Sequence, residues 1–121
     1  MLDVGIDMVK IDKIKKAMMR KSFLSKILGE EEYKQLQSMG FSAQSVAGNF
    51  CAKEAFSKAI GTGFRGIILK EIQIIRNSLG KPYIKLFGKA LNLYGEPKNY
   101  FSVSISHTED LAIAIVTRQY D

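Results

Sequence analysis

The 121-residue chain contains no tryptophan, one cysteine, one histidine and two prolines. The single cysteine, Cys51, excludes an internal disulfide, and so few cysteines and histidines exclude a zinc cluster. No apolar run approaches the roughly 20 residues that a transmembrane helix needs. The basic segment and long apolar run of a secretion signal are also missing from the first residues. We therefore expect a protein of the reducing cytoplasm that does not associate with membranes.

Apolar and charged residues occur in ordinary proportions. Hydrophobic residues make up 46% of the chain and charged residues 25%, as in a typical globular protein. The length predicts a single domain over residues 1–121, with little room for a deep pocket, so a site shared between subunits has to be considered. The net charge of +6 favours anionic partners such as nucleic acid, acidic proteins or phosphorylated metabolites.

The first residues predict a β-strand that ends at a carboxylate. Apolar residues alternate with small or acidic ones from Leu2 to Met8, which is the period of a strand. Asp7 falls at the predicted end of this strand, a common place for functional carboxylates in folds that alternate strands and helices. The alternative is that Asp7 caps the next helix or faces solvent.

A short helix with one cationic face follows. The spacing of Ile11 and Ile14 predicts a helix that continues to about Arg20. Lys13, Lys16 and Arg20 share the opposite face of this helix. Such a charge cluster is either a solvated face or a docking surface for an acidic partner.

The longest predicted helix begins at Ser42 or Ser45 and ends at Ile60, before a glycine-rich loop. It places Glu54 and Lys58 one turn apart among small apolar residues. A carboxylate in such surroundings needs a partner, because an unpaired buried charge is unfavourable. Lys58 is one candidate partner, and a metal ion is the other.

The second half of the chain is β-rich. Residues 67–69 and 71–76 predict strands, residues 77–80 a turn, residues 81–86 a returning strand and residues 88–94 a helical turn. The clearest hairpin pairs residues 101–106 with 111–116 through a turn that contains His107. Alternating serines on the first strand, opposite small residues of the second, suggest close packing against another subunit. Together these elements predict an α+β fold in which a long central helix packs on a mostly antiparallel sheet with a C-terminal β-hairpin.

Three other patterns point to no specific chemistry. Residues 61–66 match G-x-G-x-x-G, but they follow a helix, whereas a dinucleotide site requires a preceding strand. Gly80 and Lys81 lack the remaining residues of a P-loop. Cys51 and His107 could be imagined as nucleophile and base, yet a cysteine in mid-helix is better explained as a buried structural thiol.

Asp7 and Glu54 together suggest a magnesium site. Magnesium typically binds one or two carboxylates, several waters and a substrate phosphate. Lys58 could then hold a phosphate oxygen, and His107, beside Ser106, could donate to the same anion. For a lone histidine in a turn, a solvated side chain is the alternative.

Four blocks of this sequence resemble the holo-acyl carrier protein synthase family, the small phosphopantetheinyl transferases. They occur in the order of the family and span almost the whole chain: Gly5-Ile6-Asp7, the stretch from Phe50 to Gly63, Gly80-Lys81-Pro82-Tyr83, and Val103 to Thr108. The resemblance implies a magnesium-dependent transfer of 4′-phosphopantetheine from coenzyme A to a serine of an apo acyl carrier protein. Adenosine 3′,5′-bisphosphate would be released, and the product would serve fatty acid synthesis.

The resemblance also implies residue roles and an assembly. Asp7 and Glu54 would bind magnesium, and Lys58 would act beside them on the pyrophosphate. The coenzyme A site would be lined by Lys58, Lys81, Pro82, Ser106 and His107, and the acidic carrier protein would dock on Lys13, Lys16 and Arg20. The enzyme would be a homotrimer with active sites between subunits. The proton acceptor for the carrier serine stays open among Glu54, a water on the metal and another carboxylate.

Two positions depart from the pattern of the family. Lys13 stands where an arginine is usual, and it retains the charge without the bidentate geometry. Asn49 stands where an arginine is common before Phe50. If that arginine contacts a phosphate of coenzyme A, another cation has to compensate in this chain.

Two other functions compete with the transferase. The positive net charge and the cationic helix also suit a small nucleic-acid-binding protein, whose binding would depend steeply on salt. No nucleic-acid recognition motif is present, however. An inactive member of the family that only binds carrier proteins is the other alternative, and the intact pair Asp7 and Glu54 argues against it.

Overall fold

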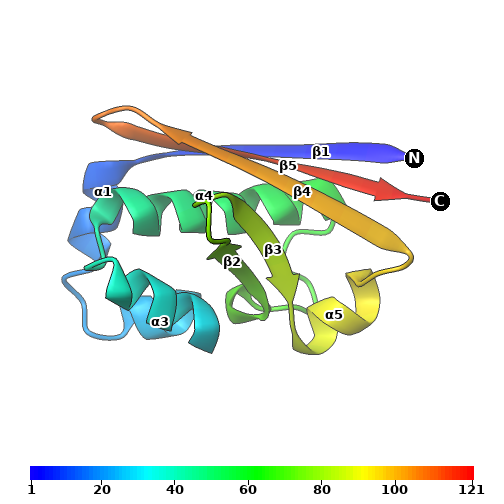
Figure 1. Ribbon diagram of the computed structural model, residues 1–121, viewed down its shortest axis with the longest axis horizontal. Coiled ribbons are helices and arrows are strands. Elements are labelled where there is room, and N and C mark those ends of the chain that lie inside the picture. Colours follow the sequence, from blue (N-terminus) through cyan, green and yellow to red (C-terminus); the bar gives the residue numbers. More distant parts are fainter.

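A three-stranded antiparallel sheet lies across one long helix in the computed structural model, which describes residues 1–121 (Figure 1). The order of the strands is β1 (Leu2–Lys10), β5 (Leu111–Tyr120) and β4 (Asn99–His107). The helix beneath them is α4 (Ala43–Ile60). The first and last strands of the chain are therefore neighbours, and both termini lie at the same end of the sheet.

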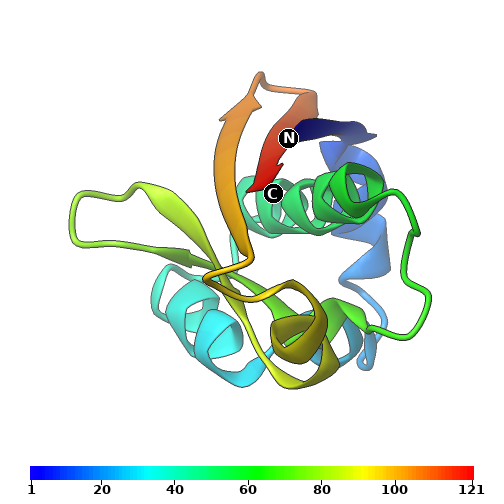
Figure 2. The same ribbon diagram turned by 90° about the vertical axis from the view of Figure 1, so that its right-hand side faces the viewer.

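A second layer lies on the other side of α4. It contains a two-stranded antiparallel hairpin, flanked by short helices, and the turn of the hairpin extends away from the body of the molecule (Figure 2). The remaining elements are α1 (Ile11–Ala17), α2 (Phe23–Ile27), α3 (Glu30–Ser38), the 3-10 turn η1 (Leu69–Glu71), β2 (Ile72–Arg76), β3 (Pro82–Leu86) and α5 (Gly88–Tyr94). The predicted fold class, α+β with a long central helix on an antiparallel sheet, is confirmed.

Helix α4 forms the core because it is covered on both sides. The Ser42 hydroxyl caps its start by accepting a hydrogen bond from the Ser45 backbone N–H at 3.1 Å. Gly61 ends it in the left-handed conformation, with a φ of 80°. Twelve of the 18 helix residues are buried, so α4 lacks the single apolar stripe of a surface helix.

The sheet packs closely on α4 because glycine stands at the point of contact. A Cβ atom on Gly5 would lie 1.9 Å from the carbonyl oxygen of Ala55, so no other residue fits there. On the helix, a Cβ on Gly48 would lie 2.9 Å from Cγ2 of Ile105. This contact between backbone and sheet accounts for a glycine in mid-helix, which lowers helix stability by about 1 kcal/mol relative to alanine.

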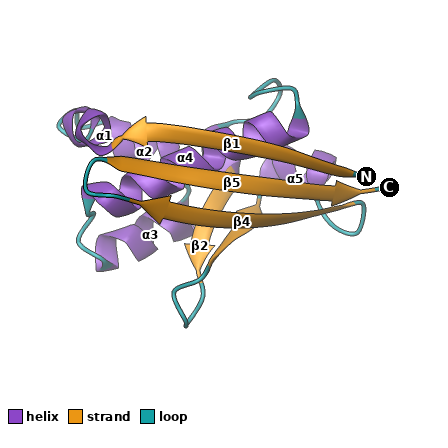
Figure 3. Ribbon diagram, turned by 90° about the horizontal axis from the view of Figure 1, so that it is seen from above, coloured by secondary structure: helices purple, strands orange, loops and turns teal.

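The two faces of the three-stranded sheet differ in their surroundings. The inner face packs on α4 through the buried residues Val103, Ala112, Ala114 and Val116. The outer face has no helix above it (Figure 3) and exposes large apolar side chains: Leu2, Val4, Ile6, Met8 and Ile115. An uncovered apolar face of this kind marks a candidate surface for association.

Several predicted element boundaries were wrong. Strand β1 continues to Lys10, so Asp7 lies inside the strand instead of at its end. His107 is the last residue of β4, where it pairs with Ala112, and does not belong to the turn. Helix α1 already ends at Ala17, which leaves Arg20 in the following turn.

Two further predictions about the β-rich half also fail. Residues 67–69 form no strand; Leu69 instead begins the 3-10 turn η1. Two of the three serines of β4 do not face small residues, because Ser104 pairs with Ile115 and Ser106 with Ile113. The small residues of β5 lie on the inner face against α4. None of the helices is both long and apolar enough to cross a bilayer.

Candidate active site

Asp7 projects from the inner face of β1 towards α4. It lies in the strand directly opposite Ala114 of β5. Its Oδ1 atom accepts a hydrogen bond from Nζ of Lys58 at 3.1 Å, and the same ammonium group donates to the Ile6 carbonyl oxygen at 2.9 Å. The two contacts bring the strand carboxylate and the helix lysine to one place, as the sequence analysis expected.

Glu54 stands one turn before Lys58 and is half-buried. Burial raises the pKa of the Glu54 carboxyl group, and the negative charge of Asp7 raises it further, whereas Lys58 lowers it. The negative charge of Asp7 on β1 thus acts on the Glu54 carboxyl group of α4. No hydrogen-bond donor of the protein contacts the Glu54 carboxylate, so its oxygens are free to bind another group.

The arrangement fits a magnesium ion. Two carboxylates from different elements converge beside one cation, and no group of three or more histidine, cysteine or acidic side chains gathers around them. Magnesium commonly binds one or two carboxylates and completes its shell with waters and substrate phosphate. Structural zinc, in contrast, requires four protein ligands.

Cys51 lies next to this site but is not suited to be a nucleophile. Its side chain is fully buried, and its thiol donates to the carbonyl oxygen of Ala112 at 3.5 Å. Burial, together with the nearby charge of Asp7, raises the pKa of the Cys51 thiol to about 12. The thiolate is therefore disfavoured at neutral pH, in agreement with the interpretation as a structural thiol.

A polar cleft of about 220 Å³ lies at the other edge of the sheet. The start of α4, the turn of the β2–β3 hairpin and the end of β4 enclose it. Its lining residues are Gln44, Ser45, Arg76, Gly80, Pro82, Ile105 and His107. A larger cavity of about 400 Å³, between β3, α5 and β4, contains none of the predicted site residues.

The structure brings some of the predicted coenzyme A residues together and separates others. Pro82 and His107 both line the cleft. Lys81 precedes Pro82 but is not among the lining residues, and its backbone N–H donates to the side chain of Asn77 at 3.0 Å. Ser106 is exposed and points to the outer face of the sheet, opposite to His107, because successive residues of a strand alternate.

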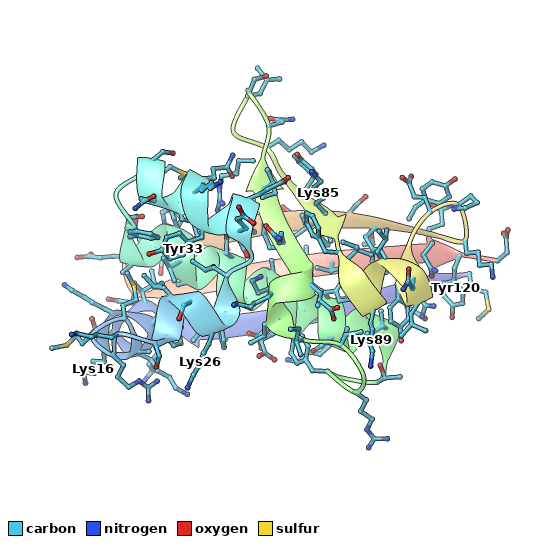
Figure 4. The ribbon with its side chains drawn as sticks, turned by 90° about the horizontal axis from the view of Figure 1, so that it is seen from below. Lys16, Lys26, Tyr33, Lys85, Lys89 and Tyr120 are labelled. Carbon is cyan, nitrogen blue, oxygen red and sulfur yellow. The ribbon has the colours of Figure 1, made fainter.

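The predicted docking residues form an exposed group around α1. Lys13 and Lys16 are both exposed on the helix, and Arg20 follows in the turn, where its guanidinium lies 5.9 Å from the centre of the Phe23 ring. Figure 4 shows Lys16 and Lys26 at the same end of the molecule, so α2 adds to the positive charge there.

Sequence reasoning missed two buried or half-buried cations. Lys53 is completely buried and forms an ion pair with Glu32 at 2.7 Å. Arg76 lines the cleft and donates to the side-chain oxygen of Asn49 at 2.7 Å. The available signal for Lys53 was its position among the small apolar residues Cys51, Ala52 and Ala55 of an otherwise buried helix segment. Arg76 carried no such signal, because only the folded hairpin brings it to α4.

Comparisons with known proteins identify the class to which this fold and site belong. Residues 3–116 match the model of the 4′-phosphopantetheinyl transferase superfamily. The match covers nearly the whole chain, so the protein belongs to this superfamily, and the predicted enzyme class is confirmed.

Individual relatives narrow this assignment. The holo-[acyl-carrier-protein] synthase of Clostridium beijerinckii is 45% identical over 114 residues, which cover 93% of each chain. The crystal structure of the Bacillus anthracis holo-(acyl-carrier-protein) synthase in complex with CoA (3′,5′-ADP) superposes with a TM-score of 0.79 at 30% identity, covering 98% of this chain and 96% of that one. The Helicobacter pylori enzyme in complex with coenzyme A gives a TM-score of 0.81 at 30% identity, over 96% and 99% of the two chains. The resemblance to the holo-acyl carrier protein synthases is thereby confirmed.

Proposed function

We propose that this protein transfers 4′-phosphopantetheine from coenzyme A to a serine of an apo acyl carrier protein in the cytoplasm, for fatty acid synthesis. The observation that carries the proposal is the convergence of Asp7, Glu54 and Lys58 beneath the sheet. Similar chains bear the name holo-[acyl-carrier-protein] synthase, and two similar structures contain coenzyme A. These relatives favour the transferase over the nucleic-acid-binding alternative.

The reaction requires positioning and charge neutralisation more than covalent help from the protein. The serine oxygen of the carrier forms a bond to the β-phosphorus of coenzyme A while the bond from that phosphorus to the bridging oxygen breaks. The leaving group is adenosine 3′,5′-bisphosphate, and the serine proton passes to a base. Negative charge grows on the bridging oxygen as the bond breaks, so a cation placed beside it lowers the barrier.

The residues of the site divide this work. Asp7 and Glu54 would hold magnesium, which acts as a Lewis acid on phosphoryl oxygens when bound. Lys58 is anchored by the Ile6 carbonyl oxygen, so its ammonium group is already in place to neutralise the pyrophosphate. The partial burial of Glu54 lowers the effective dielectric around its own carboxylate and so strengthens the electrostatic interactions of that group.

The division of the site over two edges of the sheet supports an assembly with shared sites. Asp7 lies on β1 and the polar cleft lies beside β4, and these are the two edge strands, with β5 between them. In a ring of identical subunits, the β1 edge of one subunit can face the β4 edge of the next. We infer a homotrimer whose interface buries the apolar outer face, with Ser106 directed into that interface. Light scattering measures the mass, and a monomer would contradict this inference.

The exposed cations around α1 support docking of an acidic carrier protein. Lys13, Lys16 and Arg20 have no ion-pair partner within the chain, so their charges are available to a partner protein. Reversing the charges of Lys13 and Lys16 should raise the KM for the carrier and leave the KM for coenzyme A unchanged, since rim charges act mainly on association.

One experiment tests substrate, cofactor and partner together. The purified protein is incubated with magnesium, coenzyme A labelled in the pantetheine arm and apo acyl carrier protein. Label on the carrier serine supports the proposal, and its loss upon chelation of magnesium supports the metal. No transfer by the folded protein, or tight binding of duplex DNA in place of the carrier, would contradict it.

A further inference from the structure

Arg76 is a cation without an anionic partner at the wall of the polar cleft. It is the last residue of β2, and its side chain is half-buried. None of the five ion pairs of the structure includes it. The guanidinium makes one hydrogen bond, from Nη1 to Oδ1 of Asn49 at 2.7 Å. Four of its five N–H groups are therefore left without a partner in the protein.

Glu32, the acid whose charge acts on Arg76, does not satisfy the charge of the guanidinium. Burial lowers the pKa of Arg76, and the negative charge of Glu32 opposes that effect. The Glu32 carboxylate, however, is already used by Lys53, by the Asn49 side chain and by two backbone N–H groups. The N–H groups of Arg76 that have no partner in the protein are not buried, so they are open to an anion from outside.

The surroundings of Arg76 leave space for such an anion. Its Nη2 atom would lie 3.9 Å from a Cβ atom on Gly48, so no side chain of α4 covers the guanidinium at this point. His107 and Ser45 line the same cleft and carry groups that can donate to an anion. The cleft has no acidic lining residue.

Coenzyme A carries a pyrophosphate and one separate phosphate, and only the separate phosphate is without a binding site in the proposed function. Its pyrophosphate belongs with the carboxylates and Lys58 in the proposed function. The remaining phosphate is the monoester on the 3′ position of the ribose. A planar guanidinium matches such a group because two parallel N–H donors can bind two of its oxygens.

We propose that Arg76, held by Asn49, binds the 3′-phosphate of coenzyme A and makes the enzyme select coenzyme A over its 3′-dephospho form. This inference rests on the proposed function and adds a specificity-determining residue to it. Asn49 of α4 orients the guanidinium, which itself comes from the end of β2. The cation then comes from the hairpin and not from α4.

A purely structural role for Arg76 predicts a different behaviour. If the hydrogen bond to Asn49 only ties β2 to α4, replacing Arg76 would weaken all nucleotides alike or only lower stability. If Arg76 binds the 3′-phosphate, the loss would be confined to ligands that carry this group. The decisive quantity is thus the ratio of affinities for two ligands that differ only in the 3′-phosphate.

The first test is calorimetric titration of the wild-type protein and Arg76→Gln with adenosine 3′,5′-bisphosphate and with AMP. Glutamine can still donate to Asn49 but has no charge. We expect the variant to bind adenosine 3′,5′-bisphosphate roughly 10- to 100-fold more weakly, which is the contribution of a charge-assisted hydrogen bond. Its affinity for AMP should equal that of the wild type. Arg65→Gln removes an exposed arginine outside the cleft and should change neither affinity.

The second test compares kcat/KM for coenzyme A and 3′-dephospho-coenzyme A in transfer to the carrier. Wild type should prefer coenzyme A, Arg76→Gln should lose most of this preference, and Arg76→Lys should retain part of it. Thermal melting shows whether each variant is folded, and Arg76→Lys provides the comparison if the glutamine variant is not. An unchanged preference in a folded variant, or equal losses for both substrates, would overturn the inference.

The outcomes separate the inference from the proposed function. If the wild-type protein transfers no phosphopantetheine, the proposed function fails. If it does transfer and the Arg76 variants keep the wild-type preference, only the role of Arg76 fails. Wild-type protein that binds bisphosphate and AMP equally well would also contradict the 3′-phosphate subsite.

Discussion

Helix α4 presents two lysines, Lys53 and Lys58, that differ in almost every respect. Lys53 is fully buried, and its ammonium group contacts Glu32 at 2.7 Å and the carbonyl oxygens of Leu69 and Ile72. Lys58, five positions later, has a side chain that is 54% exposed and contacts Asp7 at 3.1 Å. The first lysine joins α4 to neighbouring elements inside the core, while the second stands at the open edge of the site.

Their nearby glutamates differ in the same way. Four donors saturate the Glu32 carboxylate: two side chains and two backbone N–H groups. The Glu54 carboxylate accepts no hydrogen bond from the protein, although it is half-buried. A buried charge that is fully satisfied contributes to the architecture, whereas one that is left incomplete is available for a ligand. The comparison therefore distinguishes structural from functional charges on one helix.

The strongest test of this contrast is Glu54→Gln. The change keeps the shape of the side chain but removes the charge that would hold magnesium, so we expect the transfer rate to fall on the order of 1,000-fold. Circular dichroism and thermal melting should match the wild type. Glu31→Gln, which alters an exposed acid paired with Lys85, is the control and should be fully active. Full activity of Glu54→Gln with coenzyme A and carrier protein would refute the role of Glu54.

Lys53→Met tests the structural lysine. Removing this partner leaves Glu32 buried with an uncompensated charge, so the free energy of unfolding should fall by about 3–5 kcal/mol. Urea denaturation measures the change. Lys34→Met breaks an exposed pair with Glu30 and should alter stability by less than about 1 kcal/mol. Equal effects of the two substitutions would show that the buried pair adds nothing to stability.

Lys58→Met should produce the reverse pattern. The pair with Asp7 is partly exposed, so its loss should change stability by less than about 1 kcal/mol. The transfer rate should fall by roughly 10- to 100-fold, because a charge-assisted contact to the pyrophosphate is lost. Parallel measurements of urea unfolding and single-turnover transfer separate the two effects. A large stability loss with normal transfer would place Lys58 with the structural residues.

The smallest predicted effect is on the pH dependence of magnesium binding. In the proposed site, Glu54 would bind magnesium in its ionised form, so the affinity for magnesium should be full above the pKa of this group and should decline as the pH falls through it. Burial and the charge of Asp7 raise that pKa above the ordinary 4.5, so the decline should begin at higher pH than for an exposed glutamate.

Lys58 lowers the same pKa, so Lys58→Met should move the decline to still higher pH. Calorimetric titration with magnesium at a series of pH values measures both positions. A shift to lower pH in this variant would contradict the assigned arrangement of charges.

The sequence predicted the parts of the molecule that depend on local patterns. The alternation of apolar residues in β1 is a pattern over a few residues, and so are the serine cap and the terminal glycine of α4. For this reason β1 was correctly predicted as a strand and α4 as a helix. The pairing of Asp7 with Glu54, which lie far apart in the chain, was suggested by the carboxylate ligands that magnesium prefers and was then implied by the resemblance to the family. The structure places both beneath the sheet.

The remaining features depend on contacts that the sequence does not display. Lys53 looks like a surface lysine until α3 brings Glu32 beside it. Arg76 looks like the end of a strand until the hairpin folds onto α4 and places its guanidinium at Asn49. The opposite orientations of Ser106 and His107 follow from the end of β4, which lies one residue later than predicted.

The pairing of the first strand with the last has a consequence for biosynthesis. Strand β1 pairs with no strand other than β5, so the segment that bears Asp7 completes its pairing in the sheet only with the last strand of the fold. Pairing between segments so distant in sequence slows folding, because a long loop has to close first. During synthesis, the segment that bears Asp7 would therefore complete its pairing in the sheet only after β5 has been made, whereas its packing on α4 can form earlier.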